Sequence, residues 1–155
     1  MIDPKQLERY AIIPALTLLG MDSPEARALL LGTAAQESGM GHYIRQVGGG
    51  PAMGIFQMEP ATYHDIWRNF INNRPEIKQK LAERWPTEPA PEEMITNLLL
   101  AAVMCRLHYR RVNAPIPQAD DLAGLARYWK KFYNTPMGRG SEDEFIRNWR
   151  TLVAK

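Results

Sequence analysis

Apolar residues recur at intervals of three and four over most of the chain, which is the spacing of one face of an α-helix. The segment 24–38 is the clearest case. Ser23 is a candidate N-cap, Pro24 suits a first helical turn, and Gly39 accepts the left-handed conformation that ends many helices. One stripe of this predicted helix would carry Leu30, Thr33, Ala34 and Glu37.

The same spacing predicts further helices along the chain. The segment 92–112 is apolar nearly all round in its middle, so we expect it to form the central helix of the domain. Pro86, Pro89 and Pro91 interrupt the chain before it. The other predicted helices cover 11–21, 62–72, a shorter stretch ending near Trp85, 120–134 and a last one opening with a capping box at 141–144.

Glycine and proline interrupt the helical pattern between residues 42 and 62. Gly48-Gly49-Gly50, Pro51 and Gly54 argue against a helix there, whereas Tyr43-Ile44 and Ile55-Phe56 could pair as short strands. We expect a small β-hairpin or an irregular lobe, with a flexible surface loop as the alternative. The predicted fold class is therefore α+β, predominantly α.

The length and composition predict one compact domain. A chain of 155 residues with 45% hydrophobic and 23% charged residues can bury a substantial core without disulfide or metal cross-links, so we assign residues 1–155 to a single domain. The net charge of +2 is compatible with a cell-wall polymer, a phosphate-rich partner or simple solubility, and it selects none of them.

Metal-binding and membrane-spanning patterns are missing from the sequence. The single Cys105 lies in an apolar run and is expected to pack as a small hydrophobic side chain, and the three histidines lack the spacing of metal ligands. The apolar segment 11–21 contains Pro14 and is too short to cross a bilayer. We expect no metal site, no stable membrane insertion and no export signal.

Glu37 is the candidate for acid–base chemistry. It would lie on the buried face of its helix and in the last turn, where burial and the negative end of the helix dipole both disfavour a charged carboxylate and raise its pKa. A carboxyl that stays protonated near neutral pH can serve as a general acid. The alternative is an ordinary exposed acid at a frayed helix end.

Three ordered motifs point to a known family. The first is Glu37-Ser38, the second is Gly54-Ile55-Phe56-Gln57-Met58-Glu59-Pro60-Ala61-Thr62, and the third is Phe132-Tyr133-Asn134 followed by Pro136 and Gly138. In this order they resemble the lytic transglycosylases of the lysozyme superfamily. The resemblance spans residues from about 29 to 138 and implies a lysozyme-like fold with a small β-hairpin lobe. The chain also looks like the wall-degrading enzymes of bacteriophages and prophages.

The resemblance implies a role for five residues. Glu37 matches the single catalytic acid of the family, and Ser38 matches a serine near the acetamido group of the substrate. Gln57 matches a glutamine that lines the sugar cleft, and Tyr133 with Asn134 match a pair that faces it. Tyr133 could instead be a simple core aromatic.

The resemblance also implies a reaction. Such an enzyme cleaves the β-1,4 bond between N-acetylmuramic acid and N-acetylglucosamine in bacterial peptidoglycan, leaves 1,6-anhydro ends, and needs neither cofactor nor metal. A protein of this kind would be made in the cytoplasm of a host bacterium and would act on the wall after release or as part of a virion. The sequence leaves its oligomeric state open.

Three other functions remain possible from the sequence. A hydrolysing muramidase would use Asp65 or Glu59 to position water. A phage structural or adaptor protein could keep a lysozyme-like shape without catalysis. Nucleic-acid binding is disfavoured, because Arg106, Arg110 and Arg111 form only a modest basic patch that is better explained as a solvated helix face.

Overall fold

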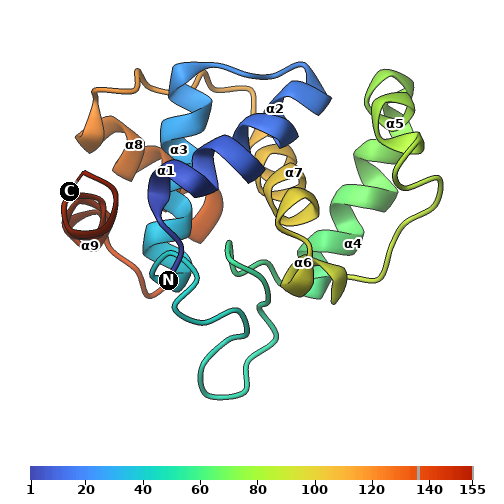
Figure 1. Ribbon diagram of the computed structural model, residues 1–155. Coiled ribbons are helices and arrows are strands. Elements are labelled where there is room, and N and C mark those ends of the chain that lie inside the picture. The colour runs from blue at the N-terminus through green and yellow to red at the C-terminus, as the bar shows by residue number, and fades with distance from the viewer. Residues whose placement is uncertain (136, 155) are drawn as a thin grey trace.

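Helices dominate the computed structural model, which describes residues 1–135 and 137–154 (Figure 1). The prediction of a predominantly helical protein is therefore confirmed. Short π-helical turns extend several of the helices, and a 3-10 turn covers Ile71–Asn73. In chain order the helices are α1 (Pro4–Leu7), α2 (Ile13–Leu19), α3 (Pro24–Ser38), α4 (Pro60–Asn69), α5 (Pro75–Ala82), α6 (Glu93–Thr96), α7 (Leu98–Arg110), α8 (Leu122–Trp129) and α9 (Glu142–Asn148).

Helix α3 has the bounds that its capping residues predict. The Ser23 hydroxyl accepts a hydrogen bond from the Ala26 amide at 3.1 Å, and Pro24 occupies the first turn. Gly39 ends the helix in the left-handed region at φ 60°. Helix α3 packs against α7, α8 and α9, so most of its surface is buried.

The predicted central helix is present but divided. Asn97 adopts an extended conformation with φ −118° and ψ 98°, so that 92–112 forms α6 and then α7 rather than one continuous helix. Its side-chain oxygen accepts from the Leu100 amide at 3.1 Å and thereby opens α7. Cys105 lies in α7 with no exposed surface, as expected for a small hydrophobic side chain.

The predicted β-hairpin is wrong. Within the described residues, the lobe between α3 and α4 holds only the isolated bridges Arg45–Met53 and Met53–Met58, and Tyr43-Ile44 does not form a strand with Ile55-Phe56. Positive φ angles at Gly48, Gly49 and Gly54 bend the chain repeatedly, and a strand cannot continue through such bends. The lobe is irregular, which was the other form that the glycine pattern allowed.

The remaining helices differ from their predicted bounds. The first helical segment begins at Pro4 instead of residue 11, and the predicted helix 120–134 becomes α8 followed by the π-helical turn Lys130–Asn134. The Ser141 hydroxyl accepts from the Glu144 amide at 3.1 Å and opens α9, as its capping motif predicts. Pro136, a member of the third motif, lies outside the described residues.

The arrangement of the helices brings the three motifs together. In Figure 1, α4 and α5 lie to one side of the buried pair α3 and α7, α8 and α9 lie to the other, and the irregular lobe hangs below them. The end of α3, the lobe and the segment after α8 therefore border one region. None of the described helices is both long and apolar enough to pass through a bilayer.

Candidate functional site

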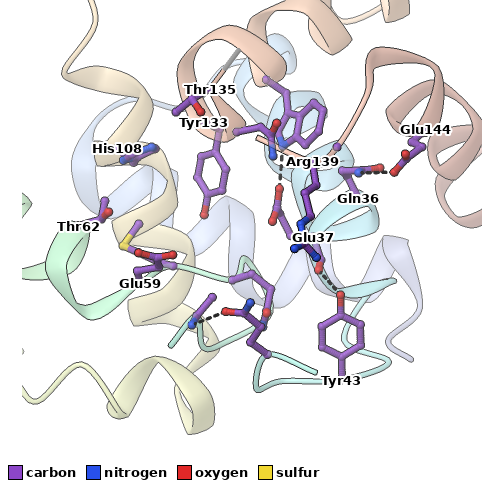
Figure 2. Close-up of a pocket in the computed structure, with 17 residues that line it drawn as sticks. Gln36, Glu37, Tyr43, Glu59, Thr62, His108, Tyr133, Thr135, Arg139 and Glu144 are labelled. Atoms are coloured by element: carbon purple, nitrogen blue, oxygen red, sulfur yellow. Dashed lines mark hydrogen bonds between the residues drawn. The ribbon is translucent and has the colours of Figure 1, made fainter. Parts of the chain in front are cut away.

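A cleft of about 810 Å³ lies between the end of α3, the lobe, α7 and the segment that follows α8 (Figure 2). Polar side chains dominate its walls, which suits a ligand rich in hydroxyl and amide groups. Residues from all three motifs line it, together with others that the motifs do not contain. Among the lining residues are Glu37, Tyr43, Gln57, Glu59, His108, Trp129, Tyr133, Asn134 and Arg139.

Glu37 is half-buried in the wall of this cleft, in the last turn of α3. Burial raises its pKa to about 7, and a hydrogen bond from the Trp129 indole acts in the opposite direction by stabilising the carboxylate. That bond joins Trp129 Nε1 to Glu37 Oε2 at 2.9 Å. The side chain is therefore a held, partly desolvated acid and not an exposed residue at a frayed helix end.

A carboxyl with a pKa of about 7 exists in both protonation states near neutral pH. The protonated form can give its proton to a leaving group, and the ionised form can then accept a proton from a nucleophile. The arrangement around Glu37 can thus support both halves of an acid–base reaction by one group.

Ser38 does not line the cleft, contrary to the position that the resemblance implies for it. Its side chain has no exposed surface, and its hydroxyl donates to the Ile55 carbonyl at 2.6 Å while accepting from the Gly41 amide at 2.9 Å. The serine therefore joins the end of α3 to the lobe. These two hydrogen bonds give a structural reason for a serine directly after Glu37.

Gln57 lines the cleft from the lobe, and its backbone lies in the left-handed region at φ 49°. Its side-chain amide donates to the Gly54 carbonyl at 2.9 Å, which holds the side chain across the turn. Gly54 itself has φ 80°, and a Cβ atom there would lie 2.7 Å from the Met94 carbonyl oxygen. The glycine of the second motif is therefore required for the close approach of the lobe to α6.

Tyr133 faces the cleft and is also part of the core. Its hydroxyl donates to the Phe56 carbonyl at 2.6 Å, and its ring centroid lies 4.7 Å from that of His108 and 5.2 Å from that of Tyr109. Burial raises its pKa well above the usual value, so the phenol stays neutral. Tyr133 can therefore line the cleft and pack as a core aromatic at the same time.

Asn134 lines the cleft next to Tyr133 and is held by a lysine. Its side-chain oxygen accepts from Lys130 Nζ at 2.7 Å. The same ammonium group donates to the carbonyl oxygens of Gly138 and Gly140 at 2.8 and 2.6 Å. Lys130 therefore organises the segment that forms one wall of the cleft.

Two residues that contact Glu37 do not belong to the recognised motifs. Trp129 lies in the predicted helix 120–134, and Tyr43 lies in one of the two segments that could have paired as short strands. The Tyr43 hydroxyl donates to the Glu37 backbone carbonyl at 2.7 Å. The position of Trp129 four residues before Tyr133, which is one helical turn, is the signal that could have placed both side chains at the same site.

Asp65, one of the two acids that a hydrolase could use to position water, is not among the residues that line the cleft. Its carboxylate accepts from Arg111 Nη1 at 2.5 Å and from the side-chain amide nitrogen of Asn69 at 2.7 Å. Glu59, the other acid considered for that role, does line the cleft. The pairing of Arg111 with Asp65 also divides the basic patch that the sequence suggested.

His108 lies between the cleft and the ion pair of Arg111 with Asp65. Its Nδ1 accepts from Arg111 Nη2 at 2.9 Å, so its proton is on Nε2. Burial lowers the pKa of His108 to about 4, and the nearby charge of Arg111 acts in the same direction. The imidazole that faces the cleft is therefore neutral at physiological pH.

Among residues 1–135 and 137–154, no three His, Cys, Asp or Glu side chains gather closely enough to hold a metal ion. Comparisons of this chain with protein-family models, with curated proteins and with solved structures return no match.

Proposed function

We propose that this protein is a peptidoglycan lytic transglycosylase with a lysozyme-like catalytic domain. It cleaves the β-1,4 bond between N-acetylmuramic acid and N-acetylglucosamine and leaves a 1,6-anhydro ring on the muramic acid. The observation that carries the proposal is Glu37, a half-buried acid with a pKa of about 7 in a polar cleft that residues of all three motifs line. The motif resemblance to this enzyme class supplies the substrate.

The first step of the proposed reaction is proton donation. The protonated carboxyl of Glu37 gives its proton to the glycosidic oxygen, and the bond between that oxygen and C1 of the muramic acid breaks. The leaving N-acetylglucosamine departs with a new hydroxyl group. Trp129 stabilises the carboxylate that Glu37 becomes, because its indole N–H already donates to Oε2.

The second step closes the anhydro ring. The Glu37 carboxylate takes the proton of the 6-hydroxyl of the same muramic acid, and the oxygen of that hydroxyl forms a bond to C1. The nucleophile is tethered to the reacting centre, which gives it an effective concentration of about 10⁵–10⁸ M when its geometry is right. Glu37 ends the cycle protonated, and no second carboxyl is needed.

Gln57, Tyr133 and Asn134 bind the sugar chain in this proposal. Their side chains come from the lobe and from the segment after α8, on two sides of the cleft. Ser38 supports the site indirectly by fastening the lobe to the helix that carries Glu37. The reaction requires neither metal nor cofactor.

A hydrolysing muramidase is the second candidate, and the position of Glu59 favours keeping it. Most hydrolysing glycosidases use two carboxyl groups, about 5–9.5 Å apart according to the stereochemistry of the product. Glu59 is exposed and lines the same cleft as Glu37, so it could orient a water molecule. In that case the product would carry a reducing end instead of an anhydro ring.

Substitution of the two acids separates these functions from each other and from a non-enzymatic role. Glu37→Gln keeps the size of the side chain and an oxygen for Trp129 but removes the proton donor. We expect it to lower the rate of peptidoglycan solubilisation by about 10²–10⁴ while thermal unfolding shows an intact fold. Glu59→Gln should leave most activity in a transglycosylase and abolish it in a hydrolase that depends on Glu59.

Glu83→Gln, which removes an exposed carboxylate after α5, is the matched control. Activity that survives Glu37→Gln would overturn the proposed role of this residue. An inactive wild-type protein that binds purified peptidoglycan would instead indicate a structural or adaptor protein. The motif resemblance favours an enzyme of phage or prophage origin, made in the cytoplasm of the host and acting on its wall.

A further inference from the structure

A second groove, of about 340 Å³, lies at the C-terminal end of α7. Arg106 and Arg110 contribute from the helix, Tyr128 from α8, and residues 112–116 from the segment that follows α7. The groove shares no lining residue with the cleft that holds Glu37. Any ligand it binds is therefore separate from the proposed substrate of the cleft.

Arg106 carries buried donors without a partner. Its Nε and Nη1 atoms are covered by the protein, and neither has a hydrogen-bond partner among the described residues. Buried polar groups in folded proteins are paired in the great majority of cases, and a buried charged group without a partner is especially costly. These two donors are covered where they stand, so a turn of the half-buried side chain would be needed for them to reach a ligand in the groove.

The charge around Arg106 indicates the sign of such a ligand. Burial lowers the pKa of Arg106; the neighbouring Tyr128 acts in the opposite direction, and the positive charge of Arg110 lowers the pKa further. No carboxylate is among the residues that line the groove in the described part of the chain. Two like charges are thus held close together without a counter-charge, and an anion between them would relieve their repulsion.

We propose that this groove is a binding site for a phosphate group. Arg106 and Arg110 are four residues apart on one helix, so their guanidinium groups lie on the same face. A carboxylate has two oxygens, which one guanidinium fork can satisfy, whereas a phosphate offers enough oxygens for two forks. The arginine pair therefore favours phosphate over carboxylate.

The other walls of the groove fit the carbon portion of a phosphate ester. Val112, Pro115 and Ile116 supply apolar surface beside the arginine pair. The Tyr128 hydroxyl donates to the Ala114 carbonyl at 2.8 Å and holds this wall in place. Since the two nitrogen atoms of Arg106 are covered in the free protein, we expect its guanidinium to turn toward the groove when the anion enters.

Thermal unfolding in different anions tests the site. The midpoint is measured in increasing inorganic phosphate or glycerol 3-phosphate, with chloride at matched ionic strength as the reference. A ligand that binds only the folded state raises the midpoint in a saturable manner. A response to inorganic phosphate alone assigns the free ion, and a response to glycerol 3-phosphate at lower concentration assigns an ester. No response to either beyond that in chloride overturns the proposal.

Variants connect the response to the arginine pair. Arg106→Met removes two buried donors that have no partner, so it should raise the midpoint in chloride and abolish the response to phosphate. Loss of a merely structural arginine would lower the midpoint in every buffer. Arg110→Gln changes an exposed side chain and should weaken phosphate binding about tenfold or more.

Arg150→Gln removes another exposed arginine, outside the groove, and should behave as the wild type. If Arg106→Met does not fold, the comparison of Arg110→Gln with Arg150→Gln decides the question. Equal phosphate responses in these two variants contradict the proposal. Because the groove is separate from the cleft, this result leaves the proposed catalytic role of Glu37 untouched.

Discussion

The raised pKa of Glu37 predicts how the stability of the protein changes with pH. Burial shifts this pKa from its usual value of 4.5 to about 7 in the folded protein, whereas the unfolded chain keeps the usual value. Below pH 4.5 the carboxyl is protonated in both states and its burial costs little. As the pH rises toward 7, the unfolded chain releases this proton first, so the free energy of unfolding falls. Once the pH is above the folded-state pKa of about 7, Glu37 is ionised in both states and causes no further fall in the free energy of unfolding.

The size of this effect follows from the two pKa values. A shift from 4.5 to about 7 corresponds to about 3 kcal/mol, since one pKa unit is worth about 1.4 kcal/mol. Glu37 keeps partial contact with solvent at the cleft, which screens part of the penalty. We therefore expect a loss of about 2–3 kcal/mol between pH 4.5 and pH 7 from this one side chain.

Urea unfolding followed by tryptophan fluorescence at a series of pH values measures this loss. Glu37→Gln cannot ionise, so its stability relative to the wild type should rise by about 2–3 kcal/mol between pH 4.5 and pH 7 and stay level on either side. Glu83→Gln serves as the control for the removal of a carboxylate from the surface. A constant difference between wild type and Glu37→Gln over this pH range would refute the desolvated state of Glu37.

Three further substitutions test the surroundings of the acid. Trp129→Phe removes the indole donor and should raise the pKa of Glu37 by about one to two units. The alkaline limb of the pH–activity profile should then move to higher pH. A limb that does not move would contradict the hydrogen bond to Trp129. Ser38→Ala leaves buried backbone groups unpaired and should cost about 1–3 kcal/mol in urea unfolding, whereas a purely substrate-binding serine would leave stability unchanged. Gly54→Ala should also lower the free energy of unfolding by about 1–3 kcal/mol, because φ is 80° and the new Cβ would meet the Met94 carbonyl oxygen at 2.7 Å. A variant as stable as the wild type would exclude this tight contact.

The helices could be predicted from local signals where those signals were strong. Ser23 and Gly39 mark the ends of α3 by capping chemistry that depends only on neighbouring residues. The apolar run of α7 likewise identifies a buried helix. The break at Asn97 was missed, because a residue that caps the start of one helix can also continue another, and only tertiary packing decides between the two.

The irregular lobe could not be derived in the same way. Short apolar pairs such as Tyr43-Ile44 fit a strand equally well as a bend, and the sequence pattern carries no information on the φ angles of the glycines between them. In the structure, hydrogen bonds such as that from the Ser38 hydroxyl to the Ile55 carbonyl hold the lobe in place without a β-sheet. These contacts join residues far apart in the chain.

The candidate site was predictable in part. Glu37, Gln57 and Tyr133, one residue from each motif, line the same cleft. The partners of the acid, Trp129 and Tyr43, come from other positions and depend on how α3, α8 and the lobe pack together. Burial of an acid can be inferred from periodicity, but the donor that holds it requires the fold.

The most direct test of the proposed function is the mass of the saccharides released from purified peptidoglycan in water enriched in heavy oxygen. Intramolecular attack by the 6-hydroxyl predicts muramic acid ends that are lighter by one water molecule than reducing ends and that contain no heavy oxygen. The Glu37→Gln variant should release neither product. New muramic acid reducing ends in place of anhydro ends would show that water is the nucleophile, and would contradict the single-acid transglycosylase mechanism.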